Sequence, residues 1–396
     1  MALPLDGIVV ADLTQNVAGP FCTQILGDMG ADVVKIERPL RGDDSRAWAP
    51  PWWDEESATF MSINRNKRSL ALDLKREGGL EVLRRLVGRA DVFVQSLRAG
   101  VVAELGLDFA GARALNPRLV YCSITAFGTR GPLRDLPGYD PLMQAYGGLM
   151  SVNGHPGAEP ARVGVSVVDM GTGMWAALGV MAALRERDAT GRAVEVTTAL
   201  FETALMWITH QAMGYFASGE TPRPQGSGTA MIVPYQAFPT ADGHTMIAAA
   251  SDALFVRLAD ALGAPSLARD ERFRDNPARV RHRAALVEEL SALTRERKTA
   301  DLIEVLRAHG VPCAPILSVD AVLAEPQTRE SGMVVTALHP RHADYRSIGL
   351  PVQWNGRRPG VRRVPPALGE HSADVLTWLG YTLDDVRGLR ARGVVT

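Results

Sequence analysis

The sequence predicts an α/β fold with a parallel sheet, and three observations support this prediction. Short apolar runs typical of buried strands alternate with segments whose apolar residues recur at helical spacing. The first such unit, a strand over 7–13, a helix over 19–29 and a strand over 31–37, reads as a βαβ unit. The chain has 396 residues, 46% hydrophobic and 22% charged, which is ordinary for a soluble globular protein of one large or two smaller domains.

The same alternation continues along the chain and then changes character. Strands are expected over 70–74, 92–95, 119–124 and 193–197, and helices over 78–87, 101–105, 141–147 and 199–216. A loop rich in glycine and proline over 219–228 indicates a domain boundary. A hairpin around Asp242-Gly243 follows. Later helices are expected over 252–262, 277–295, 300–309, 372–379 and 383–392.

Charge and cysteine usage restrict the classes of function. The net charge of −1 gives no chain-wide basic field for nucleic acid. Cys22, Cys122 and Cys313 are far apart and odd in number, which argues against a disulfide framework and fits a reducing compartment. The first residues lack a secretory signal, and neither end has a lipidation motif. We therefore expect a cytoplasmic protein with no nucleic-acid or membrane partner.

The stretch from Arg162 to Arg187 contains the leading candidate for a functional residue. Val163 to Val168 is predicted to be a buried strand, and a helix follows. Asp169 lies at the joint, where open α/β sheets place ligands, and a helix N-terminus should lower its pKa and supply backbone N–H groups. On this stretch alone, an ordinary N-cap is the favoured role of Asp169. The uncharged run Met170–Leu184 is too short and glycine-rich for a membrane span and predicts a buried core helix.

Two other early features suggest ligand sites. Glu37 ends the second expected strand as in dinucleotide-binding proteins, but the turn Thr14–Pro20 lacks the glycine fingerprint, so no nicotinamide site is expected. The basic hexad Asn64–Ser69 is either a solvated loop or a phosphate-binding segment.

Short motifs along almost the whole chain, in order and at characteristic spacing, suggest a family. They are Leu5–Gly7, Asp12–Thr14, Ala18–Cys22, Gly30–Pro39, Gly42–Asp43, Asn64–Ser69, Leu72–Lys75, Gly138–Asp140, Asp169, Thr190–Arg192, Pro234–Tyr235 and Gly310–Pro315. Together they resemble the class III CoA-transferases, which include formyl-CoA, carnitine and bile-acid CoA-transferases and are related to the α-methylacyl-CoA racemases. The resemblance implies a Rossmann-like large domain formed by both chain ends, residues 1–225 and 326–396. It also implies an inserted smaller α/β domain over 226–325 and an interlocked homodimer.

The resemblance also implies a reaction. Asp169 matches the catalytic aspartate, which would form a mixed anhydride and then an enzyme–CoA thioester while CoA moves from an acyl-CoA donor, such as succinyl-CoA, to a carboxylic acid. Coenzyme A enters as part of the substrate; no tightly bound cofactor and no metal are expected. The family's CoA contacts match Val17, Ala18, Arg38, Leu72 to Lys75, Ser96, Leu97 and Arg98, with Tyr139 beside the reacting centre. Gly226 and Gly228 match a loop that covers the site in some members, or they form a flexible linker.

Departures from the family patterns narrow the expected substrates. Val17, Glu104 and Pro137 replace residues typical of formyl-CoA transferases, so oxalate and formate are not expected. Tyr139 stands where the racemases have a catalytic histidine, and its phenol is a poor base near neutral pH, which favours transfer. An acyl-CoA racemase or epimerase, and a non-catalytic acyl-CoA-binding protein, remain alternatives.

Three further features receive ordinary structural interpretations. His339 and His342 form an HxxH pattern without a cysteine partner or a glutamate at ligand spacing, so surface histidines are expected rather than a metal site. The arginines Arg357, Arg358, Arg362 and Arg363 are expected in a solvated loop. Cys22 is expected to be buried rather than reactive.

Overall fold

The structure is a computed structural model that describes residues 3–342 and 344–396, and its chain divides into two compact units. Unit 1 comprises Met1–Leu149, Val163–Met213 and Pro326–Thr396, and unit 2 comprises Met150–Arg162 and Gly214–Glu325. The second domain was expected to begin at residue 226. The main part of unit 2 instead begins at Gly214, and unit 2 also includes the earlier stretch Met150–Arg162. The Gly226 N–H, which donates to the Gly154 carbonyl at 2.8 Å, ties that stretch to unit 2.

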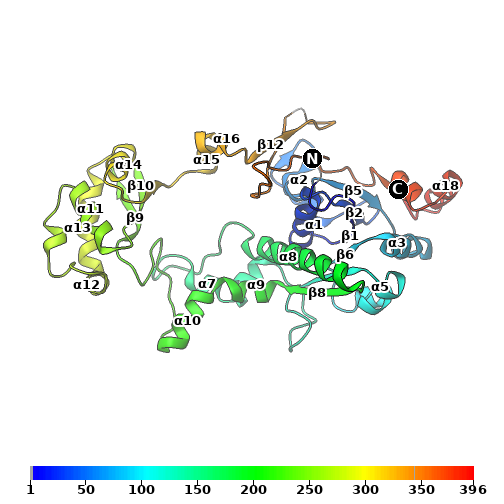
Figure 1. Ribbon diagram of the computed structural model, residues 1–396, viewed down its shortest axis with the longest axis horizontal. Helices are drawn as coiled ribbons and strands as arrows, with labels where there is room; N and C mark the ends of the chain where they lie inside the picture. The colour runs from blue at the N-terminus through cyan, green and yellow to red at the C-terminus, as the bar shows by residue number, and fades with distance from the viewer. Residues whose placement is uncertain (1–2, 343) are drawn as a thin grey trace. The chain divides into compact units, whose positions relative to one another are not determined.

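A six-stranded parallel sheet lies at the centre of unit 1, in the order β5-β2-β1-β6-β7-β8 (Figure 1). Its strands are β1 (Val9–Leu13), β2 (Asp32–Glu37), β5 (Lys67–Ala71), β6 (Val92–Gln95), β7 (Val120–Thr125) and β8 (Val194–Ala199). All five neighbouring pairs are parallel. The strand order reverses direction between β1 and β6, which confirms the predicted Rossmann-like class and creates a crevice at the ends of these two strands.

Helices cover both faces of this sheet because each strand alternates its apolar side chains between them. Val10 packs on one face with α1 (Ala18–Asp28) and α8 (Val167–Thr190). Ala11 packs on the other, with α3 (Glu77–Arg89), α5 (Phe109–Leu115), α17 (Ser372–Trp378) and α18 (Leu383–Ala391). Figure 1 shows α1 and α8 side by side. Gly173 allows this close approach, since a Cβ there would lie 2.5 Å from the Ala18 carbonyl oxygen.

Helix α8 differs from its predicted form at its beginning. The expected strand over Val163–Val168 is wrong, because residues 163–166 have no sheet partner and Val167 and Val168 are already helical. Among the described residues, α8 is the one helix whose length and composition would allow it to cross a membrane. Half of the residues in its most apolar stretch are buried inside the protein. Packing against α1, β7 and β8 accounts for the apolar residues on the buried face, whereas Met170, Met174 and Leu178 stay exposed, so the prediction of a buried core helix holds for one face only.

The remaining elements of unit 1 are short. They are the 3₁₀-helix η1 (Asp44–Ala47), the hairpin strands β3 (Trp52–Trp53) and β4 (Glu56–Ser57), α2 (Ala58–Ile63), α4 (Val101–Glu104), α6 (Asp140–Tyr146), α9 (Leu200–Trp207), α16 (Pro326–Glu330), and the paired strands β12 (Val334–Ala337) and β13 (Tyr345–Ile348). Helices α7 (Leu149–Val152) and α10 (Thr209–Ser218) cross the boundary between the units. The helix expected over 199–216 is thus two helices, α9 and α10, with a break at Ile208.

Unit 2 is a small antiparallel sheet packed against helices. Its strands β9 (Tyr235–Thr240), β10 (Gly243–Ala248) and β11 (Cys313–Pro315) are joined in the order β11-β10-β9. Its helical elements are α11 (Asp252–Ala261), the 3₁₀-helix η2 (Leu267–Arg269), α12 (Asn276–Arg281), α13 (Arg283–Arg295), α14 (Thr299–Ala308) and α15 (Val319–Ala324). The helix expected over 277–295 is interrupted at His282.

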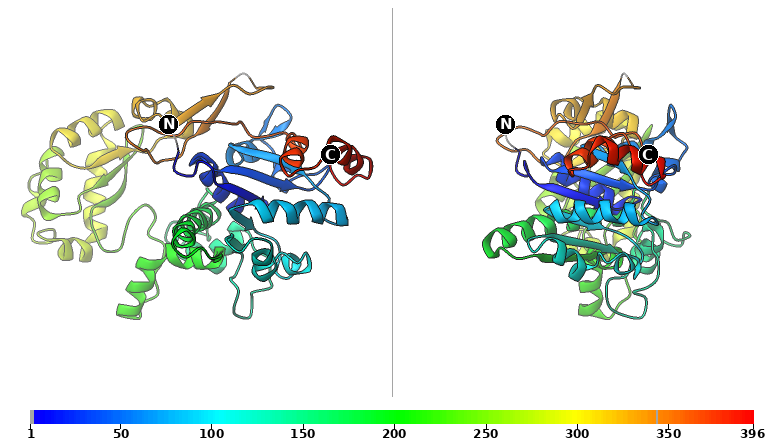
Figure 2. Two further views of the ribbon diagram at one scale, coloured as in Figure 1. Left: turned by 45° about the vertical axis from the view of Figure 1, so that its right-hand side comes forward. Right: turned by 90° about the vertical axis from the view of Figure 1, so that its right-hand side faces the viewer.

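The C-terminal stretch completes unit 1 at the β5 edge of the sheet. The His371 N–H donates to the Ser69 carbonyl at 3.0 Å, and the Asp73 N–H donates to the Val394 carbonyl at 2.9 Å. Figure 2 shows α17 and α18, in red, beside this edge.

Candidate active site

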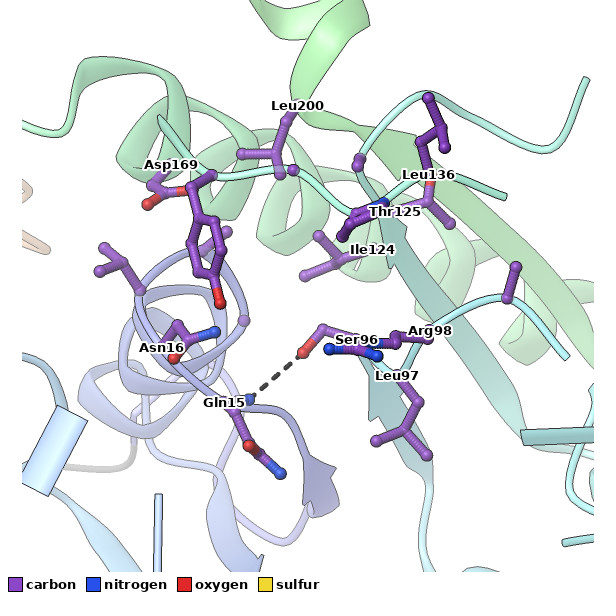
Figure 3. A pocket seen from close by; sticks show the side chains of 18 of the residues that line it. Gln15, Asn16, Ser96, Leu97, Arg98, Ile124, Thr125, Leu136, Asp169 and Leu200 are labelled. Atoms are coloured by element: carbon purple, nitrogen blue, oxygen red, sulfur yellow. Dashed lines mark hydrogen bonds between the residues drawn. The ribbon is translucent and has the colours of Figure 1, made fainter. Parts of the chain in front are cut away.

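A pocket opens at the crevice where the strand order reverses (Figure 3). Loops that follow the C-terminal ends of β1, β6 and β7 form most of its wall, and α8 contributes Asp169. The lining residues are 15–19, 96–99, 124–126, 134–139, Asp169 and Leu200. Figure 3 marks the hydrogen bond from the Gln15 N–H to Ser96 Oγ, 3.2 Å long, which joins the β1 and β6 loops. The pocket therefore occupies the place where open α/β sheets bind their ligands.

The first turn of α8 is capped by another residue's side chain and not by Asp169. Asp140, which opens α6, accepts the N–H groups of Val168 at 2.8 Å and Asp169 at 3.1 Å through the same carboxylate oxygen. Its second oxygen accepts the Gln144 amide at 2.6 Å. The N-cap role considered for Asp169 is therefore wrong, because Asp140 performs it.

The Asp169 carboxylate has an environment that opposes ionisation. Among the described residues, no side chain or backbone group donates a hydrogen bond to it and no cation pairs with it. Burial, and then the nearby negative charge of Asp140, raise the pKa of Asp169 to about 7. The expected lowering by the helix N-terminus is wrong, since desolvation and a like charge outweigh the dipole. A carboxylate poised near neutrality in a pocket is a recognised mark of a reactive group.

The start of α8 offers few backbone donors to a bound ligand. The N–H groups of Val168 and Asp169 bond to Asp140, and that of Met170 bonds to the Ser166 carbonyl at 2.9 Å. The start of α1 differs, because among the described residues no side chain caps it, and its first residues Ala18 and Gly19 line the pocket. First-turn N–H groups lack partners inside their own helix, so α1 is the better source of donors for an anion.

The β1 loop is held in place by a buried ion pair. Lys35 Nζ contacts Asp43 at 2.7 Å and the Thr14 carbonyl at 3.1 Å, and both charged side chains are fully buried. The other oxygen of Asp43 accepts the Asn16 N–H at 3.1 Å. Asn16 takes a left-handed conformation, with φ 68°, and its side-chain oxygen is buried without a partner among the described residues. The contact to Asp43 therefore fixes the backbone of Asn16, which lines the pocket.

The pocket brings together most of the sequence-predicted site residues. Val17 and Ala18, the segment Ser96–Arg98, Tyr139 and Asp169 all line it. Tyr139 is about half exposed and precedes the capping Asp140. The assignment of these residues as CoA contacts stays a prediction.

Other predicted residues lie outside this lining. Arg38 pairs with Asp44 and donates to the Gly42 carbonyl at 3.2 Å. Leu72 is buried, and Lys75 is exposed. Gly226 and Gly228 belong to unit 2, where the Gly226 N–H bonds to Gly154, so their role as a covering loop stays a prediction.

The basic hexad Asn64–Ser69 is neither a solvated loop nor a phosphate site. Its cations pair with carboxylates of unit 1, Arg65 with Asp28 at 2.6 Å and Lys67 with Asp12 at 3.2 Å. Both cationic side chains are buried, so these pairs hold the β5 segment to α1 and β1. Glu37 is similarly occupied, by Arg46 at 2.8 Å and Ser69 at 2.6 Å.

Sequence reasoning missed two residues with a clear part in the pocket. Asp140 enters the sequence analysis only as part of a motif, because nothing at the start of α6 indicates locally that its side chain caps α8. Asn16 had no assigned role, although asparagine is enriched in left-handed conformations. The contact from Asp140 to α8 joins positions 28 residues apart and could not be read locally.

Comparison with known proteins agrees with this geometry. The family model "CoA-transferase family III" matches residues 5–372. Succinyl-CoA:glutarate CoA-transferase of Mus musculus is 36% identical over 393 residues, covering 99% of this chain and 90% of that protein. Succinate–glutarate CoA-transferase of Agrobacterium fabrum is 37% identical over 382 residues, covering 95% of this chain and 96% of that protein.

A solved structure extends the agreement to the fold. The crystal structure of a CAIB/BAIF family protein from Brucella suis is 39% identical to this chain, with a TM-score of 0.86. The match covers 96% of this chain and 100% of that chain. Family match, relatives and fold coincide over nearly the whole length, and the chain belongs to CoA-transferase family III.

Proposed function

We propose that this CoA-transferase moves CoA from succinyl-CoA to a five-carbon dicarboxylic acid such as glutarate, through covalent intermediates on Asp169. The carboxylate of Asp169, which lines the pocket at the sheet crevice without a cationic partner, carries the proposal. The donor and acceptor come from the names of the relatives in mouse and Agrobacterium fabrum. Asp169 near its pKa of about 7 is partly ionised at neutral pH and is more basic than an ordinary carboxylate.

The reaction consists of four substitutions at carbonyl carbon. An Asp169 oxygen attacks the succinyl thioester, the carbon–sulfur bond breaks, and CoA thiolate leaves a mixed anhydride. The thiolate then attacks the Asp169 carbonyl carbon and releases succinate, which leaves Asp169 as a CoA thioester. The acceptor carboxylate repeats the two steps in reverse order and leaves as its CoA thioester. The Asp169 carboxylate is regenerated, and no proton, electron or cofactor is consumed.

The pocket contains groups suited to the charges that this chemistry creates. Each tetrahedral intermediate carries an oxyanion, and donors aimed at it supply much of the stabilisation in such reactions. The uncapped start of α1 at Ala18 and Gly19 provides backbone donors in the same pocket. A dicarboxylate also retains a second negative charge, and the guanidinium groups of Arg98 and Arg134 line the pocket.

A pair of acceptors of equal length tests the substrate class. Purified enzyme is incubated with succinyl-CoA and either glutarate or valerate, and acyl-CoA products are followed by mass spectrometry. Valerate has the same five carbons but lacks the second carboxylate, so we expect its kcat/KM to be at least about 100-fold lower. Equal use of the two acids would contradict the dicarboxylate assignment and leave the transfer itself intact.

The alternative that this protein is an acyl-CoA racemase is tested by a separate measurement. The half-exposed Tyr139 occupies the position expected for the racemase base, and a phenol removes an α-proton poorly near neutral pH. An acyl-CoA deuterated at carbon 2 should therefore keep its label during incubation. Loss of deuterium without CoA transfer would support racemisation instead.

We also propose a homodimer in solution. Helix α8 exposes a row of large apolar side chains at helical spacing, including Met170, Met174 and Leu178, of which the last two are each 53% exposed. Such a row is unusual on a monomer and suits an interface with a second copy. Sedimentation over a wide range of dilution should show a dimer; a compact active monomer would contradict this. The cytoplasmic location stays a prediction.

A further inference from the structure

Two histidines and a glutamate, none of which lines the Asp169 pocket, meet in unit 1. Glu56, in β4, reaches His339 and His342, which lie between β12 and β13. One potential ligand atom from each residue lies within 4.8 Å of the others. The expectation of surface histidines is wrong, because His339 is 8% and His342 4% exposed. The sequence near the two histidines has no glutamate at ligand spacing, but the fold brings Glu56 to them from a distant part of the chain.

Two buried atoms in this cluster have no hydrogen-bond partner among the described residues. They are His342 Nε2 and Glu56 Oε2, which lie 3.8 Å apart. Leaving a buried polar atom without a hydrogen-bond partner destabilises the folded state, and two such atoms facing each other need a physical reason. A metal ion between them supplies one, because ligands at about 2.0–2.2 Å from an ion can be 3.8 Å apart.

Neighbouring groups prepare His342 for ligation. Its Nδ1 lies 2.5 Å from Asp54 Oδ2, so the carboxylate holds the proton on Nδ1 and leaves the Nε2 lone pair available. A carboxylate behind a histidine in this way is the usual support for a metal-bound imidazole. The ring also lies against Trp53, with centroids 5.6 Å apart, which fixes its orientation.

The remaining side chains fit a dication in charge and reach. Arg341 pairs with Glu56 Oε1, which leaves Oε2 directed at His342. Counted formally, the two carboxylates of Glu56 and Asp54 outnumber the one guanidinium group of Arg341. The ring of His339 stacks on that of His342 at 4.4 Å, and its Nδ1 accepts the Arg341 N–H at 3.2 Å. Ligation through His339 Nε2 requires the other tautomer and loss of that long hydrogen bond.

We propose that Glu56, His342 and His339 bind one divalent transition-metal ion, with zinc the best match to two imidazoles and a carboxylate. Glu56 and His342 are the principal ligands, and His339 is the weakest because of its tautomer. The ion would join the β3–β4 hairpin to the segment between β12 and β13. These two parts are far apart in the sequence, since Arg341 comes 285 positions after Glu56. None of the three ligands lines the Asp169 pocket, so the metal would stabilise the fold without taking part in CoA transfer.

Metal content and a spectroscopic probe test this site on the full-length protein. Chelator-treated protein is titrated with Zn²⁺ or Co²⁺ and freed of unbound metal before elemental analysis. We expect one ion per chain, and visible cobalt absorption of the intensity typical of four-coordinate sites. Added Zn²⁺ should also raise the melting temperature, because an ion that binds only the folded state stabilises it. Binding well below one ion per chain would overturn the proposal.

Variants then identify the ligands. His342→Ala and Glu56→Gln should each remove stoichiometric binding, His339→Ala should weaken it less, and Asp54→Asn should weaken it by about 10–100-fold through loss of the supporting carboxylate. His371→Ala is the matched control, because His371 is also partly buried, beside Glu370 at 4.0 Å, but outside the cluster. Unchanged binding in His342→Ala, or equal loss in His371→Ala, would overturn the assignment. If His342→Ala fails to fold, Glu56→Gln and the wild-type cobalt spectrum decide.

Discussion

Asp12 and Asp169 are two carboxylates of unit 1, one fully buried and one partly buried in the pocket wall, whose pKa values shift in opposite directions. Asp12 is fully buried at the end of β1, with Lys67 at 3.2 Å and the Thr23 hydroxyl at 2.6 Å. Burial alone would raise the pKa of Asp12, but the charges of Lys67 and Lys35 and the hydroxyl bonds lower it. Burial raises the pKa of Asp169 to about 7, and its neighbour is another carboxylate. The sign of the nearest charge, more than the depth of burial, separates the two.

This difference assigns different work to the two sites. An ionised Asp12, bound by the Lys67 ammonium group and by the hydroxyl groups of Thr14 and Thr23, can join β1 to β5 but has no free lone pair to offer a substrate. The Asp169 carboxylate has no such partners, so its ionised form is less stabilised by the protein and is a better nucleophile. Substitutions that remove the charge of Asp12, of Asp169 or of its neighbour Asp140 can therefore test this comparison directly.

The largest effect is expected from Asp169→Asn, which should lower kcat by at least about 10⁴-fold. The amide cannot form the anhydride, and removing a covalent nucleophile typically costs this much. Steady-state rates with succinyl-CoA and glutarate check the loss, and mass spectrometry of wild-type enzyme with succinyl-CoA alone should find a hydroxylamine-sensitive adduct on the Asp169 peptide. A rate within about tenfold of wild type, a barrier change of only ~1.4 kcal/mol, would refute the mechanism.

The second effect concerns stability and should separate the two carboxylates most clearly. Asp12→Asn leaves Lys67 buried beside a neutral group, so we expect the free energy of unfolding to fall by about 3–5 kcal/mol. Glu81→Ala, which breaks the exposed Glu81–Arg85 pair, is the control and should cost less than about 0.5 kcal/mol. Urea unfolding measures both at pH 7, where Lys67 is still mostly charged although burial lowers its pKa to about 8. Equal losses would show that the Asp12 pair contributes no more than a surface pair.

At the same pH, Asp169→Asn should instead stabilise the protein by about 1–3 kcal/mol. The folded pKa of about 7 lies above the value of 3.8 expected in the unfolded chain, so the folded state favours the protonated form. Raising the pH from 4 through 7 removes that advantage in the wild type and leaves the neutral amide unaffected. The gain should therefore disappear near pH 4. A gain independent of pH would contradict the raised pKa.

A smaller effect is expected in the pH dependence of catalysis. Because only the ionised Asp169 is nucleophilic, kcat/KM of the wild type should rise through about pH 7 and level off above it. Asp140→Asn keeps an oxygen that can accept the α8 N–H groups but removes the like charge. Its profile should move to lower pH, with a maximal rate within about tenfold of wild type. A shift to higher pH would show that Asp140 acts by another route.

The smallest effect is expected from Arg38→Ala, outside the pocket. Arg38 is paired with Asp44 and about half exposed, so exchange of this partner for a CoA phosphate should contribute little net free energy. We expect acyl-CoA binding to weaken by about tenfold or less, with unchanged preference among acids. A changed acid preference with unaltered CoA affinity would place Arg38 at the acyl end of the substrate.

The fold was predictable where the pattern of residues is local. The alternation of apolar runs predicts the six strands of the parallel sheet and most helices, because side chains repeat every two or about 3.6 residues along them. The valines over 163–168 misled this reasoning. Their β-branched side chains favour a strand, but Asp140 caps the backbone there and starts a helix instead.

The site was predictable only in part, because pairing between distant segments leaves no local trace. Asp169 and Ser96–Arg98 were predicted from the family resemblance, whereas the raised pKa of Asp169 depends on burial and then on the charge of Asp140, which belongs to another helix. Buried partners likewise make the basic hexad structural, with Lys67 meeting a carboxylate 55 positions away. His342 looked like a surface histidine for the same reason, since Asp54 lies 288 positions before it.

The junction between β5 and the C-terminal stretch has a consequence for biosynthesis. The Ala71 N–H is bound by Ser372, which is made 301 positions later, after the whole of unit 2. A chain that emerges N-terminus first therefore holds an incomplete sheet while the inserted unit is synthesised and folds. The open β5 edge is a site for wrong pairing during that interval. We expect nascent chains stalled before residue 372 to bind chaperones and resist proteases poorly, whatever their catalytic residues.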